Sequence, residues 1–228
     1  MSTAEILGYV FNGWGFAVGA AVYFLESRRR GFNASQTREL ALIGVVVGIV
    51  TATLGQSVYE WIRHGFAGLP AAGGRTILVG VLGGWAAVEV AKWRLGIRQK
   101  TGALWALALP AGESVGRIGC WFHGCCYGKV CHLPWAVYQH EAWRHPTQFY
   151  LSVAAVINFA VVFRFRDRPE IFAISIFIWS MSRIIIEPLR ESTDTTPWLV
   201  PSICAGMAFW AVSRIVQSRR MAHFSGSA

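Results

Sequence analysis

Two arginine–glutamate pairs at helical spacing stand inside stretches of the chain that are otherwise apolar. Glu113 precedes Arg117 by four residues and Arg183 precedes Glu187 by the same interval, so each pair shares one helix face. A charge at the centre of a bilayer costs about 2.5–3.5 kcal/mol on insertion scales, so such residues face a bundle interior and act there. Two guanidinium groups form a fork that fits a phosphate, and the most available phosphate in a membrane is a lipid headgroup. We predict that Arg117 and Arg183 hold a phospholipid, and that Glu113 and Glu89 join helices through ion pairs.

A cluster of cysteines and histidines follows directly, within residues 120–132. The cysteines have the spacing Cys-x4-Cys-Cys-x4-Cys, at Cys120, Cys125, Cys126 and Cys131, with His123 and His132 between and beside them. Structural zinc modules use a paired Cys-x2-Cys, so we expect no metal here. A disulfide among these cysteines fits an oxidising compartment. A nucleophilic cysteine assisted by His123 is the third reading, and it requires a thiol pKa lowered by nearby cations.

Seven apolar stretches must position these side chains. They run over residues 6–25, 40–62, 76–91, 102–122, 147–163, 171–187 and 196–213. A helix needs about 17–25 such residues to cross a bilayer. The chain is 54% hydrophobic and 14% charged, well below the roughly 25% charged residues of soluble domains, which excludes an ordinary soluble enzyme. We predict an all-α membrane protein with seven transmembrane helices in a single domain over 1–228, with an outer loop at about 123–146. Glycines on both sides of Arg117 predict that the fourth helix unravels there.

The basic residues predict the orientation of the chain. A net charge of +9 on a soluble protein would indicate nucleic acid, but the distribution of the charge decides here. Fourteen of the 21 lysines and arginines follow the first, third, fifth and seventh stretches, and five follow the others. The positive-inside rule then places the N-terminus outside and the C-terminus in the cytoplasm, in agreement with an odd number of spans. We expect the membrane as a partner and no nucleic acid. The sequence has no Gly-rich phosphate loop and no recognised ligand pair, so no cofactor is expected.

Three motifs resemble those of the prolipoprotein diacylglyceryl transferase family. Residues 116–119, Gly-Arg-Ile-Gly, resemble the start of the family signature, and residues 144–150, Arg-His-Pro-Thr-Gln-Phe-Tyr, are similar to its Arg-His-Pro-Ser-Gln-Leu-Tyr. The third motif matches an arginine–glutamate–arginine pattern on a late helix, at Arg183, Glu187 and Arg190. The resemblance is specific over 110–191 and looser upstream. It implies an enzyme of the bacterial inner membrane with seven helices and an outer N-terminus.

The resemblance also implies a reaction. Phosphatidylglycerol enters sideways from the bilayer, and Arg117 and Arg183 hold its phosphate while Glu187 orients Arg183. The thiol of a cysteine in a lipobox-containing preprotein attacks the glycerol carbon, and glycerol phosphate leaves. The catalytic set that it implies is Arg117, Arg183, Glu187 and His123. The substrate-binding residues that it implies are His145, Gln148, Arg144, Arg190, Cys120, Cys125 and Tyr150.

Four positions depart from the family pattern. Leu78 stands where the family has a histidine that is a candidate base, and Thr53 stands where it has an arginine late in the second helix. Cys120 and Cys125 replace an asparagine and a glutamate of the signature. Histidine is the side chain that most often serves as a general base, so His123 replaces the missing base, or it hydrogen-bonds a loop carbonyl. The alternatives to the family's reaction are a divergent paralog with the same lipid site and another acceptor, and a non-enzymatic thiol or metal protein of the membrane.

Overall fold

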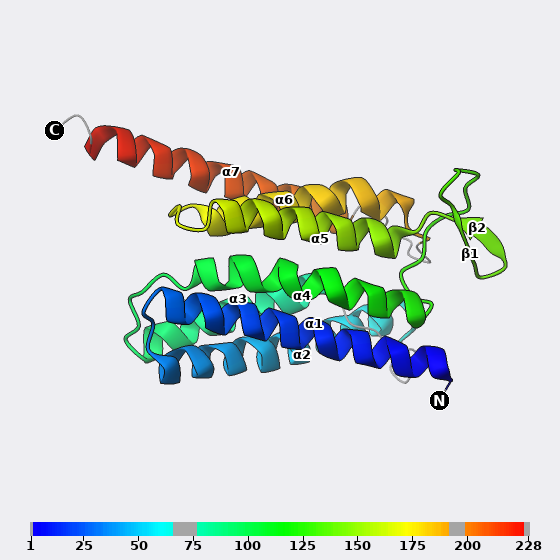
Figure 1. Ribbon diagram of the computed structural model, residues 1–228, viewed down its shortest axis with the longest axis horizontal. Helices are drawn as coiled ribbons and strands as arrows, with labels where there is room; N and C mark the ends of the chain where they lie inside the picture. Colours follow the sequence, from blue (N-terminus) through cyan, green and yellow to red (C-terminus); the bar gives the residue numbers. More distant parts are fainter. Residues whose placement is uncertain (1, 66–76, 192–198, 226–228) are drawn as a thin grey trace. The chain divides into compact units, whose positions relative to one another are not determined.

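The computed structural model describes residues 2–65, 77–191 and 199–225, and these residues are mostly helical (Figure 1). A helix lies in each of the seven apolar stretches: α1 Thr3–Arg29, α2 Ala34–His64, α3 Ile77–Arg94, α4 Gly102–Phe122, α5 Thr147–Arg164, α6 Ile171–Ile186 and α7 Leu199–Ser225. A 3-10 turn, Glu187–Leu189, continues α6, and a hairpin of β1 Val137–Gln139 and β2 Ala142–Arg144 lies in the loop at 123–146, which we call the outer loop after its predicted location. Residues 76 and 196–198 of the predicted stretches lie outside the described residues.

Five of the described helices are long and apolar enough to cross a membrane. The spans are Thr3–Arg29, Ala34–Val58, Thr147–Arg164, Ile171–Leu189 and Val200–Ser218. Within the described ranges, α3 and α4 do not join this group. α3 carries Glu89, Lys92 and Arg94 in only 18 residues, and α4 carries Glu113 and Arg117. The chain is therefore a multi-pass membrane protein with five candidate spans, two fewer than the sequence predicts.

The chain forms two compact units. The first joins residues 1–26 to residues 101–228, and the second spans residues 27–100. In the first unit, α4 packs against α5 and α6, and α6 packs against α7. Within this unit the start of α1 lies at the same end as the β1–β2 hairpin, and α7 ends at the opposite end (Figure 1).

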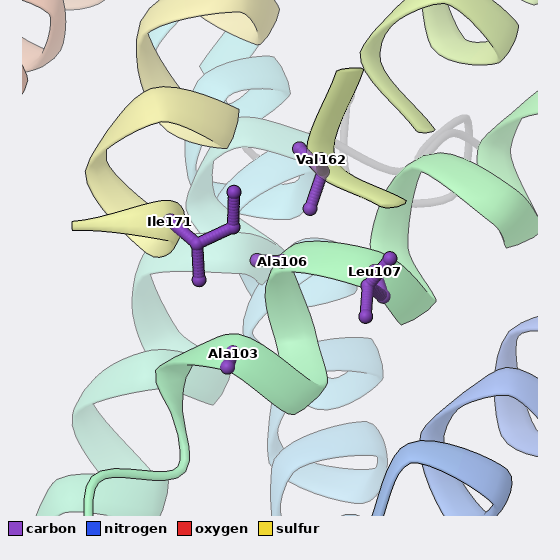
Figure 2. Close-up of a cluster of buried hydrophobic side chains, with 5 residues drawn as sticks. All are labelled: Ala103, Ala106, Leu107, Val162 and Ile171. Atoms are coloured by element: carbon purple, nitrogen blue, oxygen red, sulfur yellow. The ribbon is translucent and has the colours of Figure 1, made fainter. Parts of the chain in front are cut away.

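Small side chains on α4 form the core of the first unit. Ala103, Ala106 and Leu107 are buried together with Val162 of α5 and Ile171 of α6. Figure 2 shows Val162 and Ile171 beside this part of α4. Alanine at two of the three α4 positions lets the neighbouring helices approach closely, as is typical of helix packing in membranes.

Pro110 lies inside α4 without ending it. Proline has no amide hydrogen, so the carbonyl of Ala106, four residues earlier, lacks its helical donor. The hydroxyl of Ser175 on α6 donates to this carbonyl at 3.2 Å. An unsatisfied carbonyl is costly where no water is available, so this bond stabilises both α4 around Pro110 and its contact with α6.

Glycines bring α1 and α4 into backbone contact. A Cβ built on Gly15 would lie 2.8 Å from the carbonyl oxygen of Gly112, and one built on Gly112 would lie 2.8 Å from that of Gly15. A Cβ built on Gly119 would lie 2.8 Å from the carbonyl oxygen of Gly8. The predicted unravelling at Arg117 is therefore wrong: α4 continues to residue 122, because its glycines are sites of close helix approach.

Replacing Gly15 by alanine is expected to separate α1 from α4, because a Cβ has no room there. Overpacking of this kind costs about 1–3 kcal/mol, so the unfolding midpoint of the purified protein in detergent should fall. Gly13→Ala is the matched control, since Gly13 lies on the same helix and a Cβ built there has nothing within 4 Å. Alanine also has the higher helix propensity. Equal midpoints for the two variants would contradict the close approach.

The second unit repeats this packing between α2 and α3. A Cβ built on Gly84 would lie 2.7 Å from the carbonyl oxygen of Gly44, and one built on Gly80 would lie 2.9 Å from that of Gly48. α2 begins at residue 34, earlier than its apolar stretch, because the Asn33 side chain accepts hydrogen bonds from two amides of its first turn.

Candidate active site

A single carboxylate joins the two arginines that the sequence singles out. Oε1 of Glu113 accepts hydrogen bonds from Arg117, at 3.1 Å from Nε and 2.8 Å from Nη2. The same oxygen accepts one from Nη2 of Arg183, at 2.9 Å, and Oε2 accepts one from Nε1 of Trp179, at 2.8 Å. The structure thus brings Arg117 of α4 and Arg183 of α6 together on Glu113.

A second carboxylate extends this group toward the outer loop. Nη1 of Arg183 lies 3.6 Å from Oε2 of Glu187, and Nη1 of Arg190 donates to Oε1 of Glu187. The guanidinium of Arg183 also lies over the ring of Trp179, 5.1 Å from its centroid. We call the five ionised residues the arginine network: Glu113, Arg117, Arg183, Glu187 and Arg190. Three arginines face two glutamates in it, so the network carries one excess positive charge.

The arginine network is shielded from solvent but not saturated. The exposed fraction of the side chain is 3% for Arg183, 8% for Arg117 and 24% for Arg190. Among the residues that the structure describes, the Nε atoms of Arg183 and Arg190 have no hydrogen-bond partner. An unpaired buried donor costs about 1–3 kcal/mol, and more on a charged group. Open donors on a cationic network are where an anion would bind.

Three of the outer cysteines converge beside this network. The Sγ atoms of Cys120, Cys125 and Cys126 all lie within 4.8 Å of one another. Cys131 is held apart from them, buried and with its amide donating to the carbonyl of Trp143 at 2.9 Å. All of these cysteines are free thiols. The structure therefore gathers three of the four cysteines, which their spacing in the sequence does not predict.

The three thiols differ in acidity. Hydrogen bonding with the thiols of Cys120 and Cys125 lowers the pKa of the Cys126 thiol, and the charges of Arg190 and Arg117 act in the same direction. The Cys125 thiol also donates to the carbonyl of Cys120, at 3.6 Å. Hydrogen bonding with the thiols of Cys120 and Cys126 raises the pKa of the Cys125 thiol, and burial adds to this rise. The pKa of Cys126 therefore lies below that of Cys125.

His123 lies against α1. Its ring meets that of Tyr9 edge-on, with 4.8 Å between the centroids, and a Cβ built on Gly8 would lie 2.6 Å from an atom of the His123 ring. The histidine that bonds a loop carbonyl is His140, whose Nε2 lies 2.7 Å from the oxygen of Gly124. His123 thus packs against a neighbouring helix, and the hydrogen bond to a loop carbonyl that was predicted for His123 is made by His140 instead.

Arg144 holds the outer loop together. Its Nε donates to the carbonyl of Gln139 at 3.0 Å, and its Nη1 donates to the carbonyl of Gly128 at 3.2 Å. Nη1 also pairs with Glu191 at 3.2 Å, and the guanidinium lies over the ring of Tyr127, 4.9 Å from its centroid. These bonds tie the hairpin to the segment that follows α6.

Two residues of the same motif fix the cysteine loop. Nε2 of Gln148 donates to the carbonyl of Cys125 at 2.9 Å and to Oε1 of Gln139 at 3.1 Å. The hydroxyl of Thr147 donates to the carbonyl of Cys126 at 2.6 Å. Both side chains are buried, so the start of α5 sets the backbone of the loop that carries the thiols.

His145 and Tyr150 of the same motif contact each other. Nδ1 of His145 lies 3.5 Å from the hydroxyl of Tyr150. That hydroxyl also accepts a hydrogen bond from Nε1 of Trp135, at 2.7 Å. The motif of residues 144–150 therefore organises the outer loop through backbone and side-chain contacts.

The chain matches one known protein family over most of its length. The model of the prolipoprotein diacylglyceryl transferase family matches residues 8–218. The chain belongs to this family. It is therefore an enzyme of a transferase family of lipoprotein biosynthesis.

Several curated relatives share the family's full name, phosphatidylglycerol–prolipoprotein diacylglyceryl transferase. The protein of Thermotoga petrophila is 28% identical over 200 residues, which cover 77% of this chain and 67% of that protein. The protein of Clostridioides difficile is 24% identical over 204 residues, which cover 83% of this chain and 80% of that protein. The protein of Clostridium tetani is 28% identical over 215 residues, which cover 82% of this chain and 83% of that protein.

Two of the residues that depart from the family pattern, Leu78 and Thr53, have no ionisable side chain. Leu78, at the place of the family's histidine, is a buried residue of α3 and has no group that can transfer a proton. The hydroxyl of Thr53 donates to the carbonyl of Ile49 in its own helix, at 3.0 Å. Neither residue replaces the ionisable group that it stands for.

The helix-joining ion pair predicted for Glu113 is present, because its carboxylate accepts bonds from Arg117 of α4 and from Arg183 of α6. The same prediction is wrong for Glu89, which pairs with Lys92 of its own helix. Sequence reasoning missed one member of the site. Trp179 was not singled out, although it stands four residues before Arg183 and therefore on the same helix face. That spacing is the signal that would have found it.

Proposed function

We propose that this enzyme moves a diacylglyceryl group from phosphatidylglycerol to the thiol of a prolipoprotein cysteine, releasing glycerol phosphate. The observation that carries the proposal is the arginine network, with its excess positive charge and its unpaired Nε donors on Arg183 and Arg190 in the described structure. The names of the relatives support the same two substrates.

In this reaction the arginine network acts on the leaving group. Arg117 and Arg183 hold the lipid phosphate, and Glu113 and Glu187 fix the directions of the guanidinium groups. The acceptor sulfur forms a bond to the glycerol carbon while the carbon–oxygen bond to phosphate breaks. The electron pair of that bond goes to the phosphate oxygen, and the thiol proton goes to solvent. Preoriented cations in a site of low dielectric stabilise this developing charge.

We propose a topology of seven spans in the bacterial inner membrane, with the N-terminus outside and the C-terminus in the cytoplasm. The charges of α4 are paired within its own unit, which lowers the cost of placing this helix in the bilayer. α3 has 18 residues, as many as α5, which is one of the candidate spans. The loop at 123–146 then lies on the outer face, where a secreted preprotein arrives.

The residues of the outer rim have supporting roles in this proposal. Arg190 adds a donor for the phosphate, and Arg144 and Gln148 position the loop. His145 and Tyr150 form part of the entrance for the acceptor. His123 contacts α1 rather than the network, so its role as a base requires a movement on substrate binding.

A reconstituted assay tests the proposal. The purified protein in vesicles that contain labelled phosphatidylglycerol is incubated with a lipobox peptide, or with the same peptide carrying serine in place of cysteine. We expect lipidated peptide and glycerol phosphate in equal amounts from the cysteine peptide, and neither from the serine peptide. If neither product forms from the cysteine peptide in vesicles that contain phosphatidylglycerol, the proposal is wrong.

A second candidate keeps the lipid site and changes the acceptor. It is favoured by Cys120 and Cys125, which stand where the family pattern has an asparagine and a glutamate. This candidate predicts that glycerol phosphate is released with small thiols or other peptides but not with the lipobox peptide. The same assay, run with a panel of acceptors, separates the two.

A further inference from the structure

The three-thiol group has the dimensions of a metal site. The Sγ atoms of Cys120, Cys125 and Cys126 lie within 4.8 Å of one another. A zinc–sulfur bond of about 2.3 Å separates the sulfurs of a trigonal or tetrahedral site by roughly 3.8–4.0 Å. The sulfurs therefore have to approach one another by no more than about 1 Å to share one ion.

The local backbone is shaped to gather these sulfurs. Cys120 stands in the last turn of α4, and the chain reverses through Gly124 and Cys126, whose φ angles are 61° and 60°. A residue with a side chain pays about 1–2 kcal/mol for this left-handed conformation. The bond from the buried Gln148 to the carbonyl of Cys125 holds the reversed loop in place. The strained turn at Cys126 thus directs two successive cysteines back toward the helix.

The surrounding charges favour a metal bound as a thiolate complex. Arg117 and Arg190 lie close enough to interact electrostatically with Cys126. Three thiolates and one divalent ion carry a net charge of −1, which these guanidinium groups balance. Cys125 is exposed, so the group is open to the outside and an ion has a route to it.

We propose that Cys120, Cys125 and Cys126 bind one zinc ion, whose fourth position is open to the acceptor thiol. Zinc is the borderline-soft ion that thiolates favour, and its catalytic sites have three protein ligands and one exchangeable position. This inference rests on the proposed function, since it concerns how the acceptor is activated. A bound zinc ion would convert the acceptor thiol to a thiolate without the histidine that Leu78 replaces.

As the acceptor sulfur binds zinc, its proton passes to water, because a thiol that coordinates a metal is deprotonated. The sulfur attacks the glycerol carbon, and the carbon–oxygen electron pair leaves with the phosphate held by the arginine network. The product is a neutral thioether, which binds zinc weakly and vacates the fourth position.

Metal binding is tested on the reduced full-length protein in detergent. Zinc content is measured by mass spectrometry, and cobalt serves as the spectroscopic probe because thiolate ligands give it a sulfur-to-cobalt charge-transfer band. We expect one zinc per chain and a strong band. Cys125→Ser and Cys126→Ser should lose stoichiometric zinc and most of the band. Cys131→Ser is the matched control and should keep both, since Cys131 lies in the same loop outside the group. Matching elution profiles in detergent show that the variants are folded.

A second measurement addresses the open position. Adding the lipobox peptide to the cobalt-loaded protein should strengthen the charge-transfer band, because a fourth sulfur binds, and the serine peptide should not. Absence of stoichiometric zinc, or equal zinc in the Cys125→Ser and Cys131→Ser variants, overturns the site. A spectrum that the cysteine peptide leaves unchanged overturns the role of the fourth position. Failure of the proposed function shows separately, as a lack of glycerol phosphate release from a protein that still gives the cobalt band.

Discussion

Replacing either Arg117 or Arg183 by alanine is expected to lower kcat/KM for diacylglyceryl transfer by about 100-fold or more. Removing one preoriented donor from a developing anion typically costs a factor of about 100–1,000 in rate. Both guanidinium groups are almost fully buried and bonded to Glu113, so each alanine variant loses a donor whose position Glu113 fixes. The measurement is glycerol phosphate release together with lipidation of the peptide, at several phosphatidylglycerol concentrations.

Lysine variants separate charge from geometry at the same positions. Lysine keeps the positive charge but loses the planar fork that binds a phosphate through two parallel bonds. We expect Arg183→Lys to retain more activity than Arg183→Ala, yet well below that of the wild-type protein. Arg168→Ala is the control for removal of an arginine, because Arg168 is 54% exposed and pairs only loosely with Glu170, at 3.9 Å. A near-normal rate in Arg117→Ala or Arg183→Ala would remove these residues from the phosphate site.

The parts of this molecule that depend on local sequence were predictable. Each apolar stretch is a helix where the structure describes it, because hydrophobic runs of this length have few alternatives. The pairing of charges was also within reach. Arg117 and Arg183 are costly alone in an apolar helix, so each requires a partner inside the bundle. What the sequence did not reveal is that both have the same partner, Glu113, since the spacing within one helix says nothing about a second helix.

The cysteine group shows the limit of spacing arguments more clearly. The spacing of Cys120, Cys125 and Cys126 lacks the paired pattern of zinc modules. Their convergence depends on the left-handed turn at Cys126 and on the bond from Gln148, a residue that follows more than twenty positions later. The glycines of α4 led to a wrong prediction, that the helix ends at Arg117. Gly119 is a helix breaker by propensity, but contact with α1 decides its role here.

Glu113→Gln is expected to combine a large loss of activity with a large loss of stability. The change removes the charge that Arg117 and Arg183 share, and it raises the excess positive charge of the network from one to two. Breaking a buried ion pair by removing one partner costs about 3–5 kcal/mol. Glu113 accepts four hydrogen bonds, two from Arg117 and one each from Arg183 and Trp179, and the amide group of glutamine would turn its own N–H donors toward some of these donors. Thermal unfolding in detergent and the transfer assay measure the two losses.

Glu89→Gln is the matched control for this prediction, because the sequence assigns the two glutamates the same role. Glu89 pairs with Lys92 of its own helix at 3.0 Å, but its side chain is 48% exposed. An exposed pair of this kind contributes only about 0–1 kcal/mol. We therefore expect Glu89→Gln to unfold and to react almost as the wild-type protein does. If Glu113→Gln matched it in both measurements, Glu113 would be no more than a local ion pair, and the two arginines would be held together by packing alone.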